Sequence, residues 1–199
     1  GDLALFDAPK KPAKTSVEAL KRLKVTPKIL TGDQADVAVS VCRRVGIPSE
    51  TVLTGAQMDE MTDAVLGAAV EKIHVFAELT PGQKVRLVSA LSQNGHTVGF
   101  LGDGINDIPA LCEANVGISV DTAVDAAKDA ADVVLLQKDL GVLEQGILEG
   151  RKTFTNMLKY IKITASSNFG NIFSIVCASA FLPFLPMTSL QILLLTLLY

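Results

Sequence analysis

Charged side chains occur along the chain up to Lys162, and none follows in residues 163–199. A helix needs roughly 20 apolar residues to cross a bilayer, so this uncharged stretch is long enough for a full crossing. Two prolines divide it into a longer and a shorter part. We therefore expect a transmembrane segment made of one full helix at 163–182 and a second helix at 187–199 that the last residue cuts short.

Basic side chains gather just before this stretch, at Arg151, Lys152, Lys159 and Lys162. Lys and Arg are enriched on the cytoplasmic side of membrane spans. We therefore expect an integral membrane protein with residues 1–162 in the cytoplasm and a stalk helix at 149–162. The alternative is a buried hairpin of a soluble protein, although soluble cores rarely contain so long a stretch without charge.

The composition argues against two classes of partner. The formal net charge of the 199 residues is −3, whereas a nucleic-acid-binding domain usually carries a strong basic patch. The cysteines, Cys42, Cys112 and Cys177, are widely spaced and form no C-x-x-C pair. The sequence thus predicts no nucleic-acid partner, no zinc site and no disulfide framework.

The part of the chain before the stalk alternates short apolar strands with amphipathic helices. This alternation is typical of an α/β fold in which helices cover both faces of a parallel sheet, and we expect such a domain at 1–148. A capping-box pattern predicts that the first helix begins at Thr15. The other predicted strands and helices are strands at 28–30, 73–77, 97–101, 116–119 and 133–136, and helices at 35–45, 81–93, 122–130 and from about 140.

Polar side chains lie where two of the predicted strands end. Thr31 and Asp33 end one strand, Asp103 and Asp107 follow another, and Lys84 lies one turn into a helix. Open parallel sheets bind ligands beyond the carboxyl ends of their strands. A hydroxyl, an ammonium and a pair of carboxylates suit phosphoryl transfer, which needs positioning, charge neutralisation and a carboxylate-bound Mg²⁺.

A plain structural interpretation of these residues also exists. Gly102 and Gly104 allow the backbone to turn tightly and to approach a metal or a phosphate closely. The same spacing equally fits an ordinary turn in which Asp107 caps the next helix. Taken singly, Lys84 fits a solvated helix lysine and Thr31 fits a strand-end cap.

Three motifs together have the order and spacing of a known family. Thr31-Gly32-Asp33, the run from Thr80 to Lys84, and the run from Gly102 to Asp107 closely resemble the second half of the phosphorylation domain of P-type ATPases. These enzymes belong to the haloacid-dehalogenase-like superfamily. The resemblance implies a Rossmann-like sheet of the haloacid-dehalogenase type followed by membrane helices, with ATP as substrate and a phosphoaspartate intermediate.

The resemblance also implies a role for each residue of the last two motifs. Asp103 is expected to bind the catalytic Mg²⁺, and Asp107 to help order that metal site. Lys84 is expected to neutralise the phosphoryl group and the nucleophile. Asn106 is expected to contact the region of the phosphorylated aspartate.

The first motif is given a role in holding the phosphoryl group. On the same resemblance, Thr31 hydrogen-bonds the phosphoryl oxygens, Gly32 gives access to them and Asp33 shapes the loop. With Lys84 and Asn106, these residues form the expected catalytic set.

The family's nucleophile is the aspartate of an Asp-Lys-Thr-Gly-Thr motif, and no Asp of this chain is followed by Lys. The resemblance therefore implies that the phosphorylated Asp lies outside this chain. The nucleotide-binding domain, the actuator domain and the other membrane helices are then partners from the same pump. We expect this chain alone not to hydrolyse ATP.

The predicted full span carries a polar face. Thr164, Ser167, Asn168 and Asn171 recur at helical spacing, and amides inside a membrane are costly unless they have partners. Asn168 and Asn171 offer carbonyl oxygens of the kind that hard cations accept, which suits an ion pathway. Small polar residues serve equally well as contacts between helices, and composition does not distinguish an ion pathway from such contacts.

The runs 164–171, 180–187 and 116–121 resemble bacterial magnesium-transporting P-type ATPases. That likeness implies Mg²⁺ import across the bacterial cytoplasmic (inner) membrane, with Mg²⁺ as the transported cation. The alternatives are a pump for calcium or protons, a phosphatase of the haloacid-dehalogenase type, and an inactive regulatory fragment that binds Mg²⁺ and a partner domain.

Overall fold

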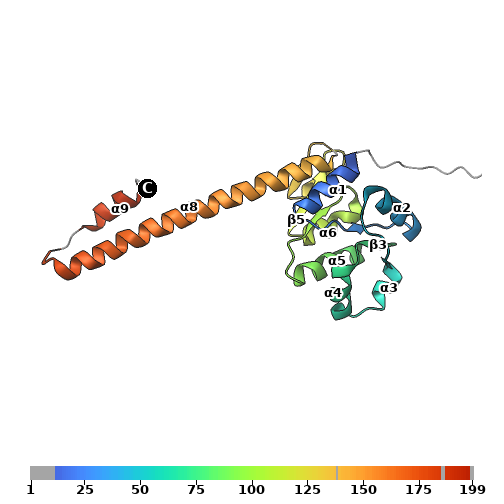
Figure 1. Cartoon of the computed structure of the whole chain (residues 1–199), viewed down its shortest axis with the longest axis horizontal. Helices are drawn as coiled ribbons and strands as arrows, with labels where there is room; N and C mark the ends of the chain where they lie inside the picture. Colours follow the sequence, from blue (N-terminus) through green and yellow to red (C-terminus); the bar gives the residue numbers. More distant parts are fainter. Residues whose placement is uncertain (1–11, 138, 185–186, 198–199) are drawn as a thin grey trace, which may run out of the picture. The chain divides into compact units, whose positions relative to one another are not determined.

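The computed structural model describes residues 12–137, 139–184 and 187–197 (Figure 1). The chain divides into two compact units, Gly1–Gln145 and Gly146–Tyr199. The predicted divisions at residues 148 and 162 stay predictions, because one helix runs through both positions.

The strands of the first unit are all parallel, as the alternation of strands and helices predicts. They form two sheets of three strands, in the orders β1-β3-β2 and β4-β5-β6, whereas the sequence predicts one sheet. Within the described residues no ladder joins β1 to β4, so each of these strands is an edge. The strands are β1 (Ile29–Leu30), β2 (Val52–Thr54), β3 (Val75–Ala77), β4 (Gly99–Leu101), β5 (Val116–Val120) and β6 (Val133–Leu135).

Helices connect the strands, as parallel pairing requires. The sequence predicts α2 and α5 with their observed bounds, and Gly46 ends α2 in a left-handed conformation with φ +77°. The first helix begins at Pro12, before the predicted capping box at Thr15, so that prediction is wrong about the start. The helices are α1 (Pro12–Arg22), α2 (Ala35–Val45), α3 (Gly55–Asp59), α4 (Asp63–Lys72), α5 (Pro81–Gln93), α6 (Ile108–Glu113) and α7 (Asp125–Ala130), with a 3-10 turn at Ile105–Asp107.

Strand β3 lies at the centre of the first sheet, and helices cover both of its faces. Val75 and Ala77 pack against α1 and α2, whereas Phe76 packs against α3, α4 and α5. Successive side chains of a strand point to opposite faces, so all three are buried. The prediction of a sheet covered on both faces is confirmed here.

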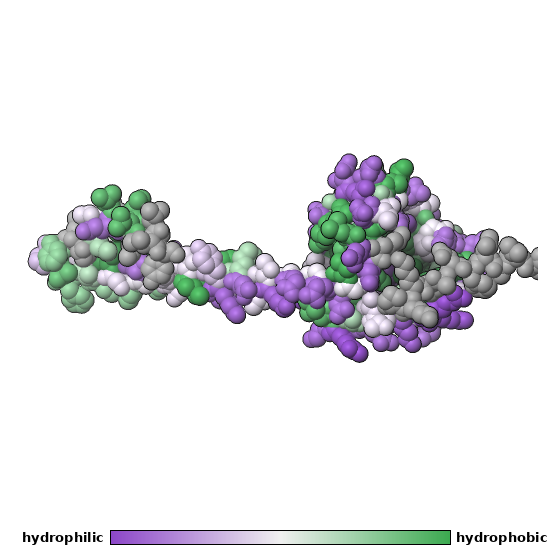
Figure 2. Space-filling view, turned by 90° about the horizontal axis from the view of Figure 1, so that it is seen from above, coloured by the Kyte–Doolittle hydropathy of each residue, from purple (hydrophilic) through white to green (hydrophobic). Residues whose placement is uncertain are grey.

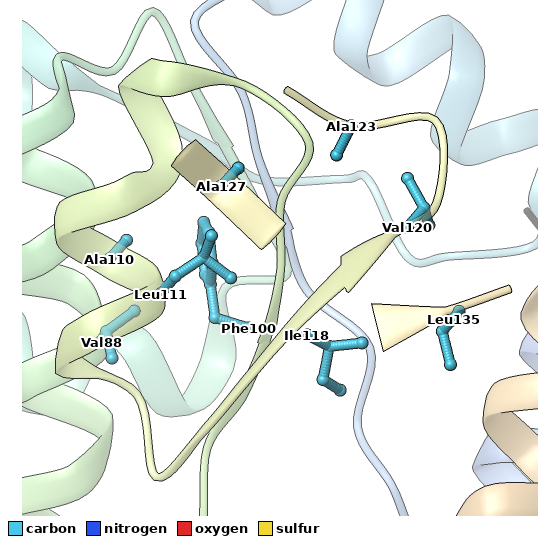
Figure 3. Packing of buried hydrophobic residues seen from close by; sticks show 9 residues of the cluster. All are labelled: Val88, Phe100, Ala110, Leu111, Ile118, Val120, Ala123, Ala127 and Leu135. Carbon is cyan, nitrogen blue, oxygen red and sulfur yellow. The ribbon is translucent and has the colours of Figure 1, made fainter. Parts of the chain in front are cut away.

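A separate cluster of apolar side chains packs against the second sheet (Figure 3). Phe100, Ile118, Val120 and Leu135 come from its three strands, helices α5, α6 and α7 supply four further side chains, and Ala123 lies in the loop before α7. Leu30 of β1 packs against this cluster and also against the cluster around Phe76. The two sheets thus share one apolar contact even though no ladder joins them.

The second unit contains most of α8 (Leu140–Phe181), a continuous helix of 42 residues, and α9 (Ser189–Leu197). No side chain of α8 is buried, and large apolar ones such as Phe169 and Phe181 are 71% and 87% exposed. Figure 2 shows that the surface of α8 is hydrophilic along its first half and hydrophobic toward its C-terminal end.

We expected a full membrane span at 163–182 and a shortened one at 187–199. Across the described ranges 12–137, 139–184 and 187–197, no helix is both long enough and apolar enough to cross a membrane. Hydroxyl and amide side chains interrupt the apolar ones between Thr164 and Ser174. Residues 198 and 199 lie outside the described part.

A polar cluster joins the C-terminal part of α4 to the loop after α5. The His96 ring nitrogen Nε2 lies 2.9 Å from Oε1 of Glu71, and Nδ2 of Asn94 donates to the same oxygen at 2.6 Å. Hydrogen bonds from Asn94 and then His96 lower the pKa of Glu71. The ionised carboxylate is therefore the form that stabilises this connection.

The first prediction concerns the core. Replacing Leu66, which is 0% exposed, by Ala should lower the free energy of unfolding by about 2–5 kcal/mol, because contacts are lost and a cavity remains. The matched change Leu136→Ala, at a side chain that is 81% exposed, should cost less than about 0.5 kcal/mol. Urea unfolding followed by circular dichroism measures both, and equal losses would contradict the packing described here.

The second prediction concerns pH. Since the pKa of Glu71 is lowered in the folded state, its stabilisation is present above the ordinary glutamate value of 4.5 and is lost as the pH falls through the folded-state pKa. The difference in unfolding free energy between wild type and Glu71→Gln should therefore be largest near neutral pH and shrink in acid. Exposed Glu50 supplies the control change Glu50→Gln. A difference that stays constant down to pH 3 would exclude the coupling.

Candidate functional site

The loop after β4 folds back tightly on itself. A Cβ atom at Gly102 would lie 2.6 Å from the Cβ of Asp107, so only glycine fits at this position. The N–H of Gly102 donates to the carbonyl of Ile118 at 3.0 Å, and its carbonyl accepts from the hydroxyl of buried Ser119 at 3.0 Å. These bonds fix the loop to β5 and hold the Asp107 side chain over the end of β4.

The two carboxylates of this loop lie in different surroundings. Asp107 is half-buried and belongs to the 3-10 turn, which its N–H closes on the carbonyl of Gly104 at 3.1 Å. Asp103 is exposed, and its carbonyl accepts from the N–H of Val124 at 3.2 Å. Asn106 is exposed as well.

An ion pair joins this loop to helix α5. Nζ of Lys84 lies 2.7 Å from Oδ1 of Asp107, and the two side chains are only 12% and 16% exposed. A pair so shielded from solvent differs from a surface salt bridge, which contributes little. Removing either partner would leave the other charge poorly solvated.

Helix α5 places Lys84 through its first turn. Thr80 caps the helix by accepting from the N–H of Gln83, and Oε1 of Gln83 accepts from the N–H of Thr80 at 2.9 Å. The Nε2 group of Gln83 also donates to the carbonyl of Gly55 and to Asp59. Pro81 at the first helical turn lacks an N–H that would otherwise need a partner.

The motif after β1 forms a compact turn. The hydroxyl of Thr31 donates to Oδ2 of Asp33 at 3.0 Å and accepts from the N–H of Asp33 at 3.1 Å. The carbonyl of Thr31 accepts from the N–H of Leu79 at 3.0 Å, next to the residue that caps α5. Gly32 is exposed, and a Cβ atom there would meet only ordinary contacts.

The turn after β3 has a strained backbone at Glu78, whose φ is +57°. A non-glycine residue in such a sparsely populated region costs of the order of 1–3 kcal/mol and persists only where its surroundings hold it. Its N–H donates to the carbonyl of Asp33 at 2.9 Å. The strained turn therefore supports the motif that begins at Thr31.

A cavity of about 320 Å³ lies beside the Asp103–Asp107 loop. Asp103, Asp107 and Asp139 supply its acidic lining. Apolar side chains from the ends of the three strands of the second sheet also line it, together with Gly102 and Leu140. This volume is at the small end of the range for small-molecule pockets.

The donor set at this loop fits Mg²⁺. Within the part of the chain that the structure describes, no group of three or more His, Cys, Asp or Glu side chains could hold a metal alone. Mg²⁺ is commonly bound by one or two carboxylates, with water and phosphate oxygens completing its octahedron. Asp103 and Asp107 supply such a pair, although Oδ1 of Asp107 also contacts Lys84.

The expected site residues are thus brought together in part. Lys84 meets Asp107, and the turn at Thr31 and Asp33 is bonded to the segment that leads into α5. In the second unit, Asn171 is half-buried and Asn168 is exposed. Sequence reasoning missed three residues that support the site: Ser119, Gln83 and Glu78. The first is a lone hydroxyl in an apolar strand and the second completes a T-x-x-Q capping pattern, but nothing in the sequence marks Glu78.

Known proteins match the chain over its whole length. The model of the haloacid dehalogenase-like hydrolase family matches residues 1–115. The magnesium-transporting ATPase, P-type 1, of Salmonella typhimurium is 54% identical over 199 residues, and that of Escherichia coli K12 is 53% identical. A probable cation-transporting ATPase F of Mycobacterium bovis is 38% identical over 197 residues. The chain spans 22% of the length of each of these relatives.

Solved structures agree with the sequence relatives. A zinc-transporting PIB-type ATPase in its E2.Pi state superposes with a TM-score of 0.68 and 28% identity, over 90% of this chain and 25% of that one. The catalytic domain of a CPx-ATPase, CopB-B, gives a TM-score of 0.55 and 29% identity over 71% of this chain and 46% of that one. The resemblance to P-type ATPases is thereby confirmed. The chain belongs to the haloacid dehalogenase-like hydrolase family, and the relatives that it matches over its whole length include magnesium-transporting P-type ATPases.

Proposed function

We propose that this chain is the second half of the phosphorylation domain of a P-type pump, together with the helices that follow. The pump couples ATP hydrolysis, through a phosphoaspartate, to the import of Mg²⁺. The observation that carries the proposal is the shielded pair of Lys84 and Asp107 beside the glycine-bounded turn at the carboxyl end of β4. The relatives of Salmonella typhimurium and Escherichia coli are magnesium-transporting ATPases, which supports the choice of ion.

The charges of the site suit phosphoryl transfer. Bound Mg²⁺ would neutralise the developing charge on the phosphoryl group. Asp103 would hold the metal, with Asp107 ordering it. Asp107 also keeps the Lys84 ammonium in place at 2.7 Å, ready to neutralise the phosphoryl oxygens. Asn106 lies on the same turn and would contact the phosphorylated aspartate.

The turn after β1 would bind the other side of the phosphoryl group. The Thr31 hydroxyl is held at 3.0 Å from Asp33 and can turn its proton toward a phosphoryl oxygen. Exposed Gly32 leaves space for the group to approach, and Asp33 fixes the loop through its N–H and its carboxylate.

The phosphorylated Asp would come from outside this chain. Among the residues that the structure describes, one side of β1 and one side of β4 have no neighbouring strand, and a further parallel strand there would place its carboxyl end near both Thr31 and Asp103. The remaining partners are the nucleotide-binding and actuator domains and the other membrane helices of the same pump. The chain spans only 22% of the length of the Salmonella typhimurium relative, which supports the assignment of these parts to the rest of the pump.

The second unit would form part of the membrane domain in the inner membrane of a bacterium, with residues 1–162 in the cytoplasm. Its half-buried residues Thr164, Ser167 and Asn171 share one face of α8. We assign Asn171, with Asn168 beside it, to the ion pathway, because their amide carbonyls suit a hard cation. The exposed apolar side chains of α8 support contact with lipid or with other helices.

The third prediction tests the phosphoryl site in the full-length pump. Asp103→Asn and Lys84→Met should each lower the rate of ATP hydrolysis by about a hundredfold or more, because each removes a charge that stabilises the transferring phosphoryl group. The changes Asp129→Asn and Lys72→Met, at exposed positions on other helices, are the controls. Steady-state hydrolysis measures all four, and full activity of Asp103→Asn would refute the proposed metal site.

The fourth prediction concerns the transported ion. Asn171→Ala should abolish rescue of growth at low Mg²⁺ in cells that lack other Mg²⁺ uptake, because a carbonyl ligand is lost. Ser166→Ala, on a different face of α8, should leave uptake intact. Uptake of Mg²⁺ into depleted cells is scored beside growth. Stimulation of hydrolysis by another cation, without rescue, would keep the pump and discard Mg²⁺ as its cargo.

A further inference from the structure

One glutamate links the two halves of the candidate phosphoryl site. Glu78, at φ +57°, donates its N–H to the carbonyl of Asp33 at 2.9 Å. The next N–H, of Leu79, donates to the carbonyl of Thr31 at 3.0 Å. Two consecutive backbone donors therefore hold both ends of the turn that carries the Thr31 hydroxyl.

The side chain of Glu78 makes a second connection to the same turn. Its Oε1 accepts from the N–H of Ala35, the first residue of α2, at 3.4 Å. Gln34, the N-cap residue, makes no capping bond with its side chain. A carboxylate is favoured at a helix N-terminus, where unpaired N–H groups and the helix dipole leave partial positive charge. The glutamate thus holds the start of α2, only two residues beyond Asp33.

The backbone of Glu78 lies against the start of α3 and shortly before the helix that carries Lys84. A Cβ atom at Gly55 would lie 2.6 Å from the carbonyl oxygen of Glu78, so the turn packs closely against the start of α3. Thr80, which caps α5, follows two residues later. A shift at Glu78 would therefore move the Thr31 turn and the Lys84 helix relative to each other.

Position 78 holds a glutamate, although its positive φ would favour a glycine. Glycine adopts a positive φ without steric cost, and it would preserve both backbone hydrogen bonds. Glutamate at this position strains the backbone, but its side chain makes the hydrogen bond to Ala35 that glycine could not make. Lys24, at φ +59°, is the other non-glycine residue with positive φ in the described chain, and it lies away from the site in the loop after α1.

We propose that Glu78 is a positioning residue for phosphoryl transfer. Its carboxylate, by holding the first turn of α2, sets the Thr31 hydroxyl relative to Lys84 without touching the phosphoryl group. This inference rests on the proposed function, because it assigns Thr31 and Lys84 to one phosphoryl site.

The test uses the full-length pump with Glu78→Gly, Glu78→Gln and the matched control Lys24→Gly. Orthovanadate, a phosphate analogue, reports on the phosphoryl site, and thermal unfolding reports on stability.

Glu78→Gly should unfold at the wild-type temperature or above, yet need about ten times more vanadate for inhibition, since small misplacements in a site are costly. Its kcat should fall while its KM for ATP stays unchanged. Glu78→Gln, which keeps the acceptor, should stay within about threefold of wild type.

Lys24→Gly should relieve the same backbone strain and leave inhibition by vanadate unchanged. Wild-type inhibition and kcat in Glu78→Gly would overturn the inference, as would a loss of activity that simply follows a fall in unfolding temperature. An equal loss in Glu78→Gln would overturn the hydrogen-bonding role. Failure of the proposed function gives a different result: the wild type would then show no vanadate-sensitive hydrolysis, or Asp103→Asn would leave it intact.

Discussion

The contact on which the site depends is the ion pair between Lys84 and Asp107, because it bonds helix α5 directly to the loop after β4. Both side chains are largely shielded, so each charge relies on the other for its stabilisation. Gly102 lets Asp107 approach the backbone closely, where a Cβ atom would lie 2.6 Å from the Cβ of Asp107. The absence of this Cβ atom therefore fixes the place of the carboxylate that meets the Lys84 ammonium.

Hydrogen bonds fix the backbone around this pair, in addition to the apolar packing of α5 and β4. The capping box at Thr80 sets the start of α5, and the bonds from Glu78 and Leu79 hold the Thr31 turn beside it. The bonds from Glu78 and Leu79 join segments that lie more than forty residues apart in the sequence. Rigid placement of this kind suits phosphoryl transfer, in which positioning and charge do most of the work.

The second unit differs from the first in that no side chain of its long helix is buried. Its long helix exposes large apolar side chains, and hydroxyl and amide groups lie among them. Neither water nor lipid alone solvates both the apolar and the polar side chains of such a helix well. Other helices or a bound cation best satisfy the hydrogen-bonding groups of its polar face. The same asparagines that suggest an ion pathway thus reduce the apolar character of the helix.

The sequence by itself determined the parallel α/β class, the bounds of α2 and α5, and the motifs at Thr31, Lys84 and Asp103, because strand and helix periodicity, helix caps and glycine turns are local signals. It missed β2, α4 and α6 and gave a wrong start for α1, because tertiary packing overrides weak local preference there. It also missed α3, although Thr54 and Gln57 form a capping box at its start. Only the tertiary structure decided the pairing of Lys84 with Asp107, the separation into two sheets and the strained turn at Glu78. Each depends on contacts between distant segments, which no local pattern records.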